Sequence, residues 1–496
     1  MSKGSWVLLA TILASSLVFV DGAVVSIALP VMQVQLHAST SEAQWVVEGY
    51  TLVLGSLTLL SGALADRLGR KRLFLAGVAL FACASLWVGL STSIGMLLLA
   101  RVVQGLGGTM LAPASLALLG AHFQGEERGK AVGTWSALTS LASTIGPVLG
   151  GVIVDHFSWR WVFAINLPLA LIVFVAAMKH VDESRDEGVS GRLDFLGSAL
   201  ITAALGLVVY SFILAQTLGW HDAEVLGTMA AGCAAFALFY LTERTVRNPI
   251  LPLALFAGKT FAGVNVLTLL LYAALGGLFY FLPFVLIRVD RYSATRAGLA
   301  LLPFVVLMVL LSRKSGALTY RFGAKLLLTA GPLLAAGGFL LFVWLPGSEY
   351  WTAVFPGQVL IGAGMGLAVA PLTTTMLESV AERHVGLASG INSAIARIAG
   401  LLAIAVLGLL LTSVFNQRLD RRMNDARLSA AEQTLVNAQR PYLAGATLAQ
   451  PRLEELVLHS YDDGFRVVAL ACALLAAAGG LVSALLIEKK PVPVDA

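Results

Sequence analysis

Charged residues are scarce in this chain of 496 residues: they make up 12%, against 58% hydrophobic residues. Ordinary soluble domains carry about 25% charged residues, so the composition excludes that class. Cysteine is almost missing too, and Cys83, Cys233 and Cys472 show no paired spacing. Disulfides and metal ligation are therefore not expected. No grouping of a nucleophile with a base occurs either, so the sequence predicts neither an enzyme nor a bound cofactor.

Long apolar stretches fill the chain instead, and mean hydropathy is +0.85. A helix of about 20 apolar residues crosses the hydrocarbon core of a bilayer. The sequence thus predicts an all-α membrane protein with fourteen transmembrane helices, at 6–30, 46–65, 73–92, 96–121, 130–154, 161–179, 194–215, 225–243, 260–287, 297–315, 325–346, 351–377, 385–413 and 464–487. The first stretch continues past residue 20 without a small-residue cleavage site, which favours an uncleaved first helix.

Lysine and arginine indicate the orientation, because cytoplasmic loops are enriched in both. With Lys3 placed inside, the segments assigned to the cytoplasm carry twenty of the thirty-three, and the short outer loops carry four. This predicts a multi-pass protein of the inner (plasma) membrane with both termini in the cytoplasm. The net charge of +5 follows from the same bias. It is no evidence for a nucleic-acid partner.

Two charged rows, 62–72 (GALADRLGRKR) and 316–325 (GALTYRFGAK), reveal an internal duplication. At an offset of 254 residues they agree at Gly, Ala, Leu, Arg, Gly and Lys, and each connects two apolar stretches. Two repeated halves in one membrane chain are typical of secondary transporters with a central pathway. We expect a six-helix bundle at 1–180, a linker with two inserted helices at 181–258, a second six-helix bundle at 259–487 with an external, partly helical loop at 414–463, and a cytoplasmic tail at 488–496.

Two carboxylates interrupt apolar spans. Asp21 lies about ten residues, or roughly 15 Å, from the outer end of the first span. A charged side chain at mid-membrane costs roughly 2.5–3.5 kcal/mol, so it needs a partner, water or a proton. We interpret Asp21 as a group that loads and releases a proton; a permanently paired strut between helices is the alternative. Glu48 lies nearer the outer end of the second span, where it could bind a cation, accept the proton or reach the interface.

Arg101, Gln104 and Gly108 fall on one face of the fourth span, at i, i+3 and i+7. Arginine keeps its proton, so its expected role is to hold or tune a nearby carboxylate. The alternative is an arginine that reaches the outer interface. The second half has no basic counterpart of Arg101, which suggests that the first half handles the protons. Arg397 is a weaker candidate.

Small residues and charges mark two further features. The fifth span contains Gly146, Pro147, Gly150 and Gly151, which allow close backbone contact and bend the helix. Plain packing and a water-excluding seal near the pathway both explain this row. The loop row sets topology, and it could also act as a cytoplasmic latch in which Asp66 pairs across the halves in one state and releases in the other. The candidate gating residues are Gly62, Asp66, Arg67, Gly69, Arg70 and Arg72.

These rows, together with the number of spans, resemble the major facilitator superfamily, and specifically its fourteen-helix drug:proton antiporters of the QacA/EmrB type. The resemblance rests on 62–72, on 101–108, on 146–151 and on the first-helix row 21–30 (DGAVVSIALP). It implies the major facilitator fold, Asp21 as the membrane-embedded acid and Arg101 as its proton-coupling partner. Row 146–151 implies antiport, and energy would come from the proton gradient.

The resemblance also implies the substrate class, namely amphipathic and often cationic drugs or toxic small molecules, exported by alternating access. Protons and the lipid bilayer are the other expected partners, and a periplasmic adaptor is left open. A proton-coupled transporter of one metabolite, siderophore or lipid is the first alternative. A non-transporting sensor or envelope-assembly subunit is the second.

Overall fold

A computed structural model describes residues 2–185, 194–246, 251–344, 350–381 and 384–488. Residues 489–496 of the expected tail, and 186–193 and 247–250 of the expected linker with its inserted helices, lie outside this part. Within the described residues, fourteen helices are long and apolar enough to cross a membrane. They overlap all the predicted spans, but two helices extend more than ten residues beyond them: the helix that begins at Val385 ends at Asp425 rather than 413, and the last helix begins at Pro451 rather than 464. Hydropathy marks only the apolar part of each helix, whereas the polar turns at 414–425 and 451–463 are helical as well.

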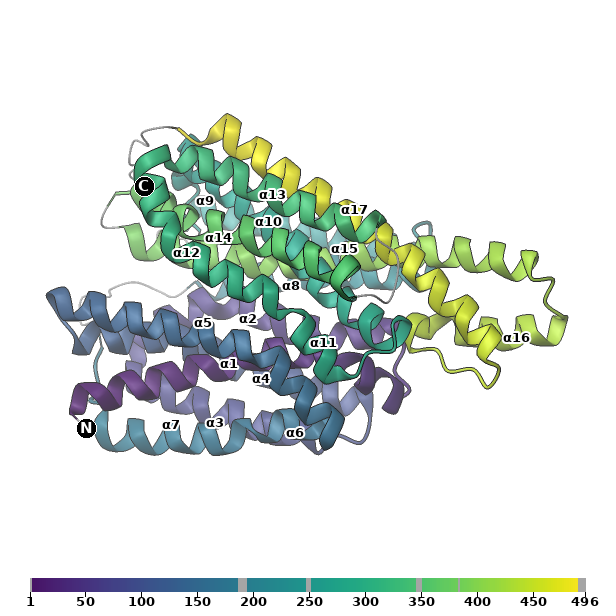
Figure 1. The fold of residues 1–496 in the computed structure, drawn as a ribbon. Coiled ribbons are helices and arrows are strands. Elements are labelled where there is room, and N and C mark those ends of the chain that lie inside the picture. Colours follow the sequence, from purple (N-terminus) through teal and green to yellow (C-terminus); the bar gives the residue numbers. More distant parts are fainter. Residues whose placement is uncertain (1, 186–193, 247–250, 345–349, 382–383, 489–496) are drawn as a thin grey trace.

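The first half is an all-helical bundle in which α1 packs against α5 and α7, and α4 packs against α2 and α3. Figure 1 shows this half as the lower layer of the molecule. Its helices are α1 (Lys3–Gln35), α2 (Thr40–Leu68), α3 (Arg70–Gly89), α4 (Ile94–His122), α5 (Gly125–His156), α6 (Trp159–Ala164) and α7 (Asn166–His180), of which α6 and α7 form one span.

The second half is the matching bundle, in which α13 packs against α14 and α17, and α10 packs against α15 and α17. Its elements are η1 (Leu253–Ala257), α10 (Lys259–Phe284), η2 (Val285–Val289), α11 (Ala294–Ala300), α12 (Leu302–Phe322), α13 (Ala324–Trp344), η3 (Tyr350–Val354), α14 (Phe355–Glu378), α15 (Val385–Asp425), α16 (Ala430–Gln439), η5 (Arg440–Gly445) and α17 (Pro451–Leu486). The expected external segment 414–463 is partly helical: it consists of the end of α15, α16, η5 and the start of α17.

The duplication is visible in the backbone. Gly69 and Gly323, 254 residues apart, end α2 and α12 with φ of +111° and +83°, a region that side chains other than glycine rarely adopt. Each is followed at once by the next helix. Close packing repeats too, because a Cβ at Gly77 would meet α4 and a Cβ at Gly331 would meet α14. Both halves therefore use the same turn and the same small-residue contact.

The two inserted helices, α8 (Phe195–Leu218) and α9 (Ala223–Thr245), pack against each other, and α8 also packs against α2 and α15. An apolar cluster around Leu205, Val209 and Leu401 fills this contact. Gln216 of α8 donates a hydrogen bond to Oε1 of Gln44 at 2.9 Å and accepts one from Thr412 at 3.3 Å. The insertion thus covers the α2–α15 side of the boundary between the halves.

Candidate functional site

Asp21 and Arg101 form a buried ion pair in the first half. Nη1 of Arg101 lies 2.5 Å from Oδ2 of Asp21, and both side chains are at most 1% exposed. Arg101 also donates to Oε1 of Gln104 at 2.7 Å and, through Nε, to the carbonyl of Val46 at 3.0 Å. Its guanidinium lies 4.2 Å from the ring centre of Tyr50. Neither side chain therefore reaches lipid or the interface.

Two polar residues that were not predicted from the sequence, Ser85 and Asn166, complete this arrangement. Gln104 Nε2 donates to Oδ1 of Asp21 at 2.8 Å and to Ser85 at 3.0 Å. Asn166 donates to the same two groups, each at 3.3 Å. Five residues, from α1, α3, α4 and α7, make up what we call the Asp21 cluster: Asp21, Ser85, Arg101, Gln104 and Asn166. Asn166 could have been noticed as an amide inside the otherwise apolar span 161–179.

Burial of the Asp21 cluster costs desolvation free energy, and the hydrogen bonds within the cluster offset that cost. Moving an ion pair out of water costs several kcal/mol per ion, which is offset only when the remaining lone pairs and protons are also satisfied. Each Asp21 oxygen has a partner here, and Arg101 is bonded from α2 as well as α1. Removing the charge of Asp21 would leave Arg101 without its counter-charge. The protonation state of one side chain is thereby linked to the packing of several helices.

Glu48 lies differently. Its side chain is fully buried on α2, and neither carboxyl oxygen has a hydrogen-bond partner among the described residues. It does not extend to the interface, which was one of the expected alternatives. An ionised carboxylate in such a place would be strongly disfavoured, so the geometry suits a protonated carboxyl. Arg397 is half-buried on α15, with its Cβ packed close to Gly55 of α2, and is not part of the Asp21 cluster.

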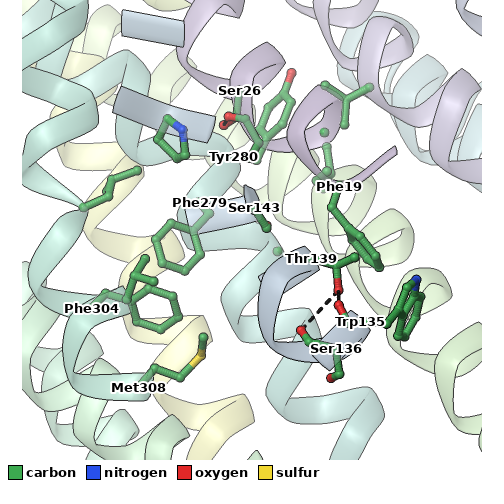
Figure 2. Close-up of a pocket in the computed structure, with 18 residues that line it drawn as sticks. Phe19, Ser26, Trp135, Ser136, Thr139, Ser143, Phe279, Tyr280, Phe304 and Met308 are labelled. Atoms are coloured by element: carbon green, nitrogen blue, oxygen red, sulfur yellow. Dashed lines mark hydrogen bonds between the residues drawn. The ribbon is translucent and has the colours of Figure 1, made fainter. Parts of the chain in front are cut away.

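A cavity of about 510 Å³ lies between the halves, next to α1 (Figure 2). The first half contributes Phe19, Ser26, Trp135, Ser136, Thr139 and Ser143. The second half contributes mainly apolar and aromatic groups, including Phe279, Tyr280, Phe304 and Met308. Asp21 and Glu48 do not line it. Gly22 and Ala23, directly after Asp21, do, so α1 carries the ion pair on one face and cavity wall on another.

The glycine row of α5 makes close contacts on two sides. A Cβ at Gly146 would lie 2.8 Å from Cβ of Ala23, and one at Gly150 would lie 2.6 Å from Cγ1 of Val24, so α5 fits tightly against α1. A Cβ at Gly151 would overlap the carbonyl of Ala294 in the other half. The helices approach closely because these positions have no side chain.

The α5–α11 contact is reciprocal, and a carboxylate closes it. A Cβ at Gly298 of α11 would overlap the carbonyl of Pro147. Asp155 of α5, which the sequence analysis did not single out, accepts hydrogen bonds from the backbone N–H groups of Ala294 and Thr295 at 3.0 and 2.7 Å. We call this contact between α5 and α11 the α5–α11 seal. It lies toward the end of the molecule that carries α16, and α5 and α12 diverge toward the other end (Figure 1).

The loop row lies at the end of the molecule that carries the termini. Asp66 accepts a hydrogen bond from Arg70 one turn later, at 2.8 Å, and makes no hydrogen bond or ion pair with the described residues of the second half. Glu183, from the segment after α7, accepts from the backbone N–H groups of Lys71 and Arg72 at 3.0 and 3.2 Å. Its carboxylate caps the start of α3, where the negative charge interacts favourably with the positive end of the helix dipole. In this conformation the row is tied to its own half.

Two repeated bundles around a central cavity, with a buried ion pair beside it, define a membrane transport protein. Residues 11–404 match the sequence profile of the Major Facilitator Superfamily, and the chain belongs to this family. It is 34% identical to the tetracenomycin C resistance and export protein of Streptomyces glaucescens, over 82% of this chain and 76% of that one. It is also 34% identical to the multidrug resistance protein Stp of Mycobacterium tuberculosis, over 84% and 78%.

Solved structures agree on the fold. A bacterial homologue of the human lysosomal transporter Spinster, in an inward-facing and unoccupied conformation, superposes with a TM-score of 0.71 at 16% sequence identity and full coverage of both chains. The expected fold of two six-helix bundles with two inserted helices is confirmed.

Proposed function

We propose that this protein is a proton-coupled efflux antiporter of the inner membrane that exports amphipathic small molecules by alternating access. The observation that carries the proposal is the buried Asp21–Arg101 pair on the helix that also lines the cavity. The relatives named as resistance and export proteins support the direction of transport and the class of cargo. The energy source is the proton gradient, and no bound cofactor takes part.

The positions of the charges and of the chain ends support a proposed orientation in the membrane. Both ends of the described chain lie at the same end of the molecule, opposite α16 (Figure 1). The basic row 66–72 is at that end too. By the positive-inside rule we take this end as the cytoplasmic side, and we infer an inward-facing conformation in which the α5–α11 seal lies on the outer side.

The proton acts on the Asp21 cluster. A proton that enters from outside neutralises Asp21, and Arg101 then loses the charge that holds it between α1 and α2. Because α1 also forms cavity wall, rearrangement of the cluster changes the cavity. Glu48 is a second acceptor, since its carboxyl has no competing partner. Proton and substrate thereby favour different conformations, and antiport follows by linkage.

The test uses purified protein in proteoliposomes with an imposed pH gradient, a fluorescent dye substrate and a second dye that reports internal pH. We expect dye movement coupled to opposite proton movement. Asp21→Asn should lose gradient-driven transport yet keep dye-for-dye exchange, because exchange needs no net proton transfer. Asp425→Asn, at an exposed position in the outer segment, serves as the matched control. Proton and dye moving in the same direction, or full gradient-driven transport by Asp21→Asn, would refute the proposal.

A further inference from the structure

Unlike the nearby Asp21 cluster, the cavity between the halves has no Asp, Glu, Lys, Arg or His in its described lining. The three groups that donate hydrogen bonds to the Asp21 carboxylate, from Arg101, Gln104 and Asn166, all belong to the first half, and Asp21 is buried among them. Glu48 is completely buried. A molecule in the cavity of this conformation therefore meets no carboxylate directly.

Hydroxyl groups supply the polarity of the cavity instead. Ser136, Thr139 and Ser143 follow one another at i, i+3 and i+7 on α5, so they form a row along one face of that helix. Ser26 of α1 adds a fourth hydroxyl on the same half (Figure 2). These four belong to the first half, and Tyr280 of α10 adds a hydroxyl from the second half.

These hydroxyls differ in how far they are already engaged. Thr139 donates to the carbonyls of Trp135 and Ser136 at 2.8 and 3.1 Å, and Ser26 donates to the carbonyl of Ala23 at 2.8 Å. Their oxygens still have lone pairs to offer. The hydroxyls of Ser136 and Ser143 have no hydrogen bond to another described residue, so each can donate as well as accept.

The opposite wall is mainly apolar, and Tyr280 is the one described lining residue there with a polar side-chain group. Phe279 and Phe304 lie with ring centres 4.7 Å apart, and Met308 lies beyond them (Figure 2). Aromatic and thioether groups of this kind pack against flat, polarisable molecules without imposing a direction. One wall can thus bind the body of a ligand while the hydroxyl row binds one edge.

From this arrangement we propose that the cavity selects uncharged amphiphiles: largely flat apolar molecules with carbonyl, ether or hydroxyl oxygens along one edge. The inference rests on the proposed function, and it narrows the cargo from amphipathic drugs in general to those that need no positive charge. A cation in this cavity would lose its water and gain no carboxylate, which disfavours it. A neutral ligand loses less and regains its hydrogen bonds from α5.

Equilibrium binding to purified protein in lipid nanodiscs tests this without transport. The probes are an acylnaphthalene dye that carries a carbonyl and a neutral dimethylamino group, and competitors of the same ring system that end either in a hydroxyl or in a trimethylammonium group. We expect the hydroxyl competitor to displace the dye at concentrations at least tenfold lower than the trimethylammonium competitor. Equal or stronger displacement by the cation would overturn the proposal.

Substitutions locate the effect. Ser136→Ala with Ser143→Ala should weaken binding of the neutral dye about tenfold, whereas Thr134→Val, which removes a hydroxyl on the same helix outside the cavity, should leave it unchanged. Ser143→Asp should raise the affinity of the cationic competitor at least tenfold; Ser136→Asp, at a more exposed position, provides the same test if the first variant does not fold. If the double alanine variant binds as the parent does, the hydroxyl row is not the binding edge.

The binding result stands apart from the proposed function. Neutral-selective binding in a protein that moves no protons would leave the cavity inference intact and refute antiport. Proton-coupled export of cations only, with no neutral dye bound, would do the reverse.

Discussion

The carboxylate of Asp155, near the end of α5, accepts the backbone N–H groups of Ala294 and Thr295 at the start of α11. The two residues Asp155 and Ala294 belong to different halves of the chain, 139 positions apart. One side chain therefore joins the halves beside the glycine contact that lets their backbones touch. A carboxylate bound to two backbone donors at a helix start is a strong, charge-assisted interaction. It must break whenever this end of the molecule opens.

Asp155→Ala should therefore shift the protein toward the outward-open conformation. Hydrogen bonds to a charged group contribute about 1.5–3 kcal/mol each, so even partial loss moves a two-state equilibrium tenfold or more. A single cysteine at Ser26, in a cysteine-free background, reports on the cavity behind the α5–α11 seal. We expect an impermeant maleimide, added outside intact cells, to label this cysteine about tenfold faster in the Asp155→Ala variant than in the protein that retains Asp155. Asp182→Ala, at the opposite end, is the control, and unchanged labelling of the Asp155 variant would contradict this role.

Gly151→Val and Gly298→Val should each abolish export while the protein still inserts and folds. A Cβ at either position overlaps a backbone carbonyl of the other half, at Ala294 and Pro147 respectively, and backbone cannot move aside. The halves are then kept apart on the outer side, so the inward-open state is not reached. Dye export from cells and size-exclusion chromatography measure the two effects. Gly133→Ala on the same helix has open space around its Cβ and should behave as the parent. Loss of export in this control variant would show that α5 tolerates no substitution, and would contradict the role given to the α5–α11 seal.

Arg101→Leu should be more harmful than the double variant Asp21→Asn with Arg101→Leu. Removing one member of a buried ion pair leaves an uncompensated charge and costs about 3–5 kcal/mol, whereas removing both can be nearly neutral. Thermal unfolding of the detergent-purified protein measures this. We expect the single variant to melt well below the parent and the double variant to recover most of the difference, without recovering proton-driven transport. Equal melting of both variants would mean that Asp21 is not charged in this structure.

Asp290, in the connection between η2 and α11, leads us to expect a pH dependence of stability. Burial, with a smaller contribution from the negative charge of Asp462, raises the pKa of its carboxyl from 3.8 to about 6. The folded protein thus holds this proton more tightly than the unfolded chain does. The contribution to stability is present below about pH 4, is lost as the pH rises toward 6, and changes no further above that.

Asp290→Asn should remove this dependence, because an amide does not titrate. We expect the variant to melt at a higher temperature than the parent at pH 7 and to show a smaller fall in melting temperature between pH 4 and 6. Fluorescence-detected unfolding across pH 4–7.5 gives both curves. Asp425→Asn, at an exposed position at the end of α15, should follow the parent. Parallel curves for the parent and Asp290→Asn would assign the pH dependence to other groups.

Hydropathy and spacing determined the number of spans, the duplication and the residue types that matter in the first half. A stretch of about 20 apolar residues has no stable place except across a bilayer, so span positions are local properties. The repeat at 62–72 and 316–325 is likewise readable, because both turns require a glycine with positive φ. A carboxylate and an arginine inside apolar spans also predict that each needs a partner, and the Asp21–Arg101 pair meets that need.

Only the tertiary structure decided which residues meet and which face the pathway. Ser85 joins the Asp21 cluster from α3, and Asp155 bonds to the other half, yet in sequence each looks like an ordinary polar residue. Asn166 is conspicuous as an amide in an apolar span, but its partner Asp21 cannot be read from the sequence. The cavity lining was equally hidden, since Ser136 and Ser143 on α5 resemble the hydroxyl residues of any membrane helix. The rotation of each helix about its axis is set by packing with several neighbours at once, and a one-dimensional pattern does not encode that rotation.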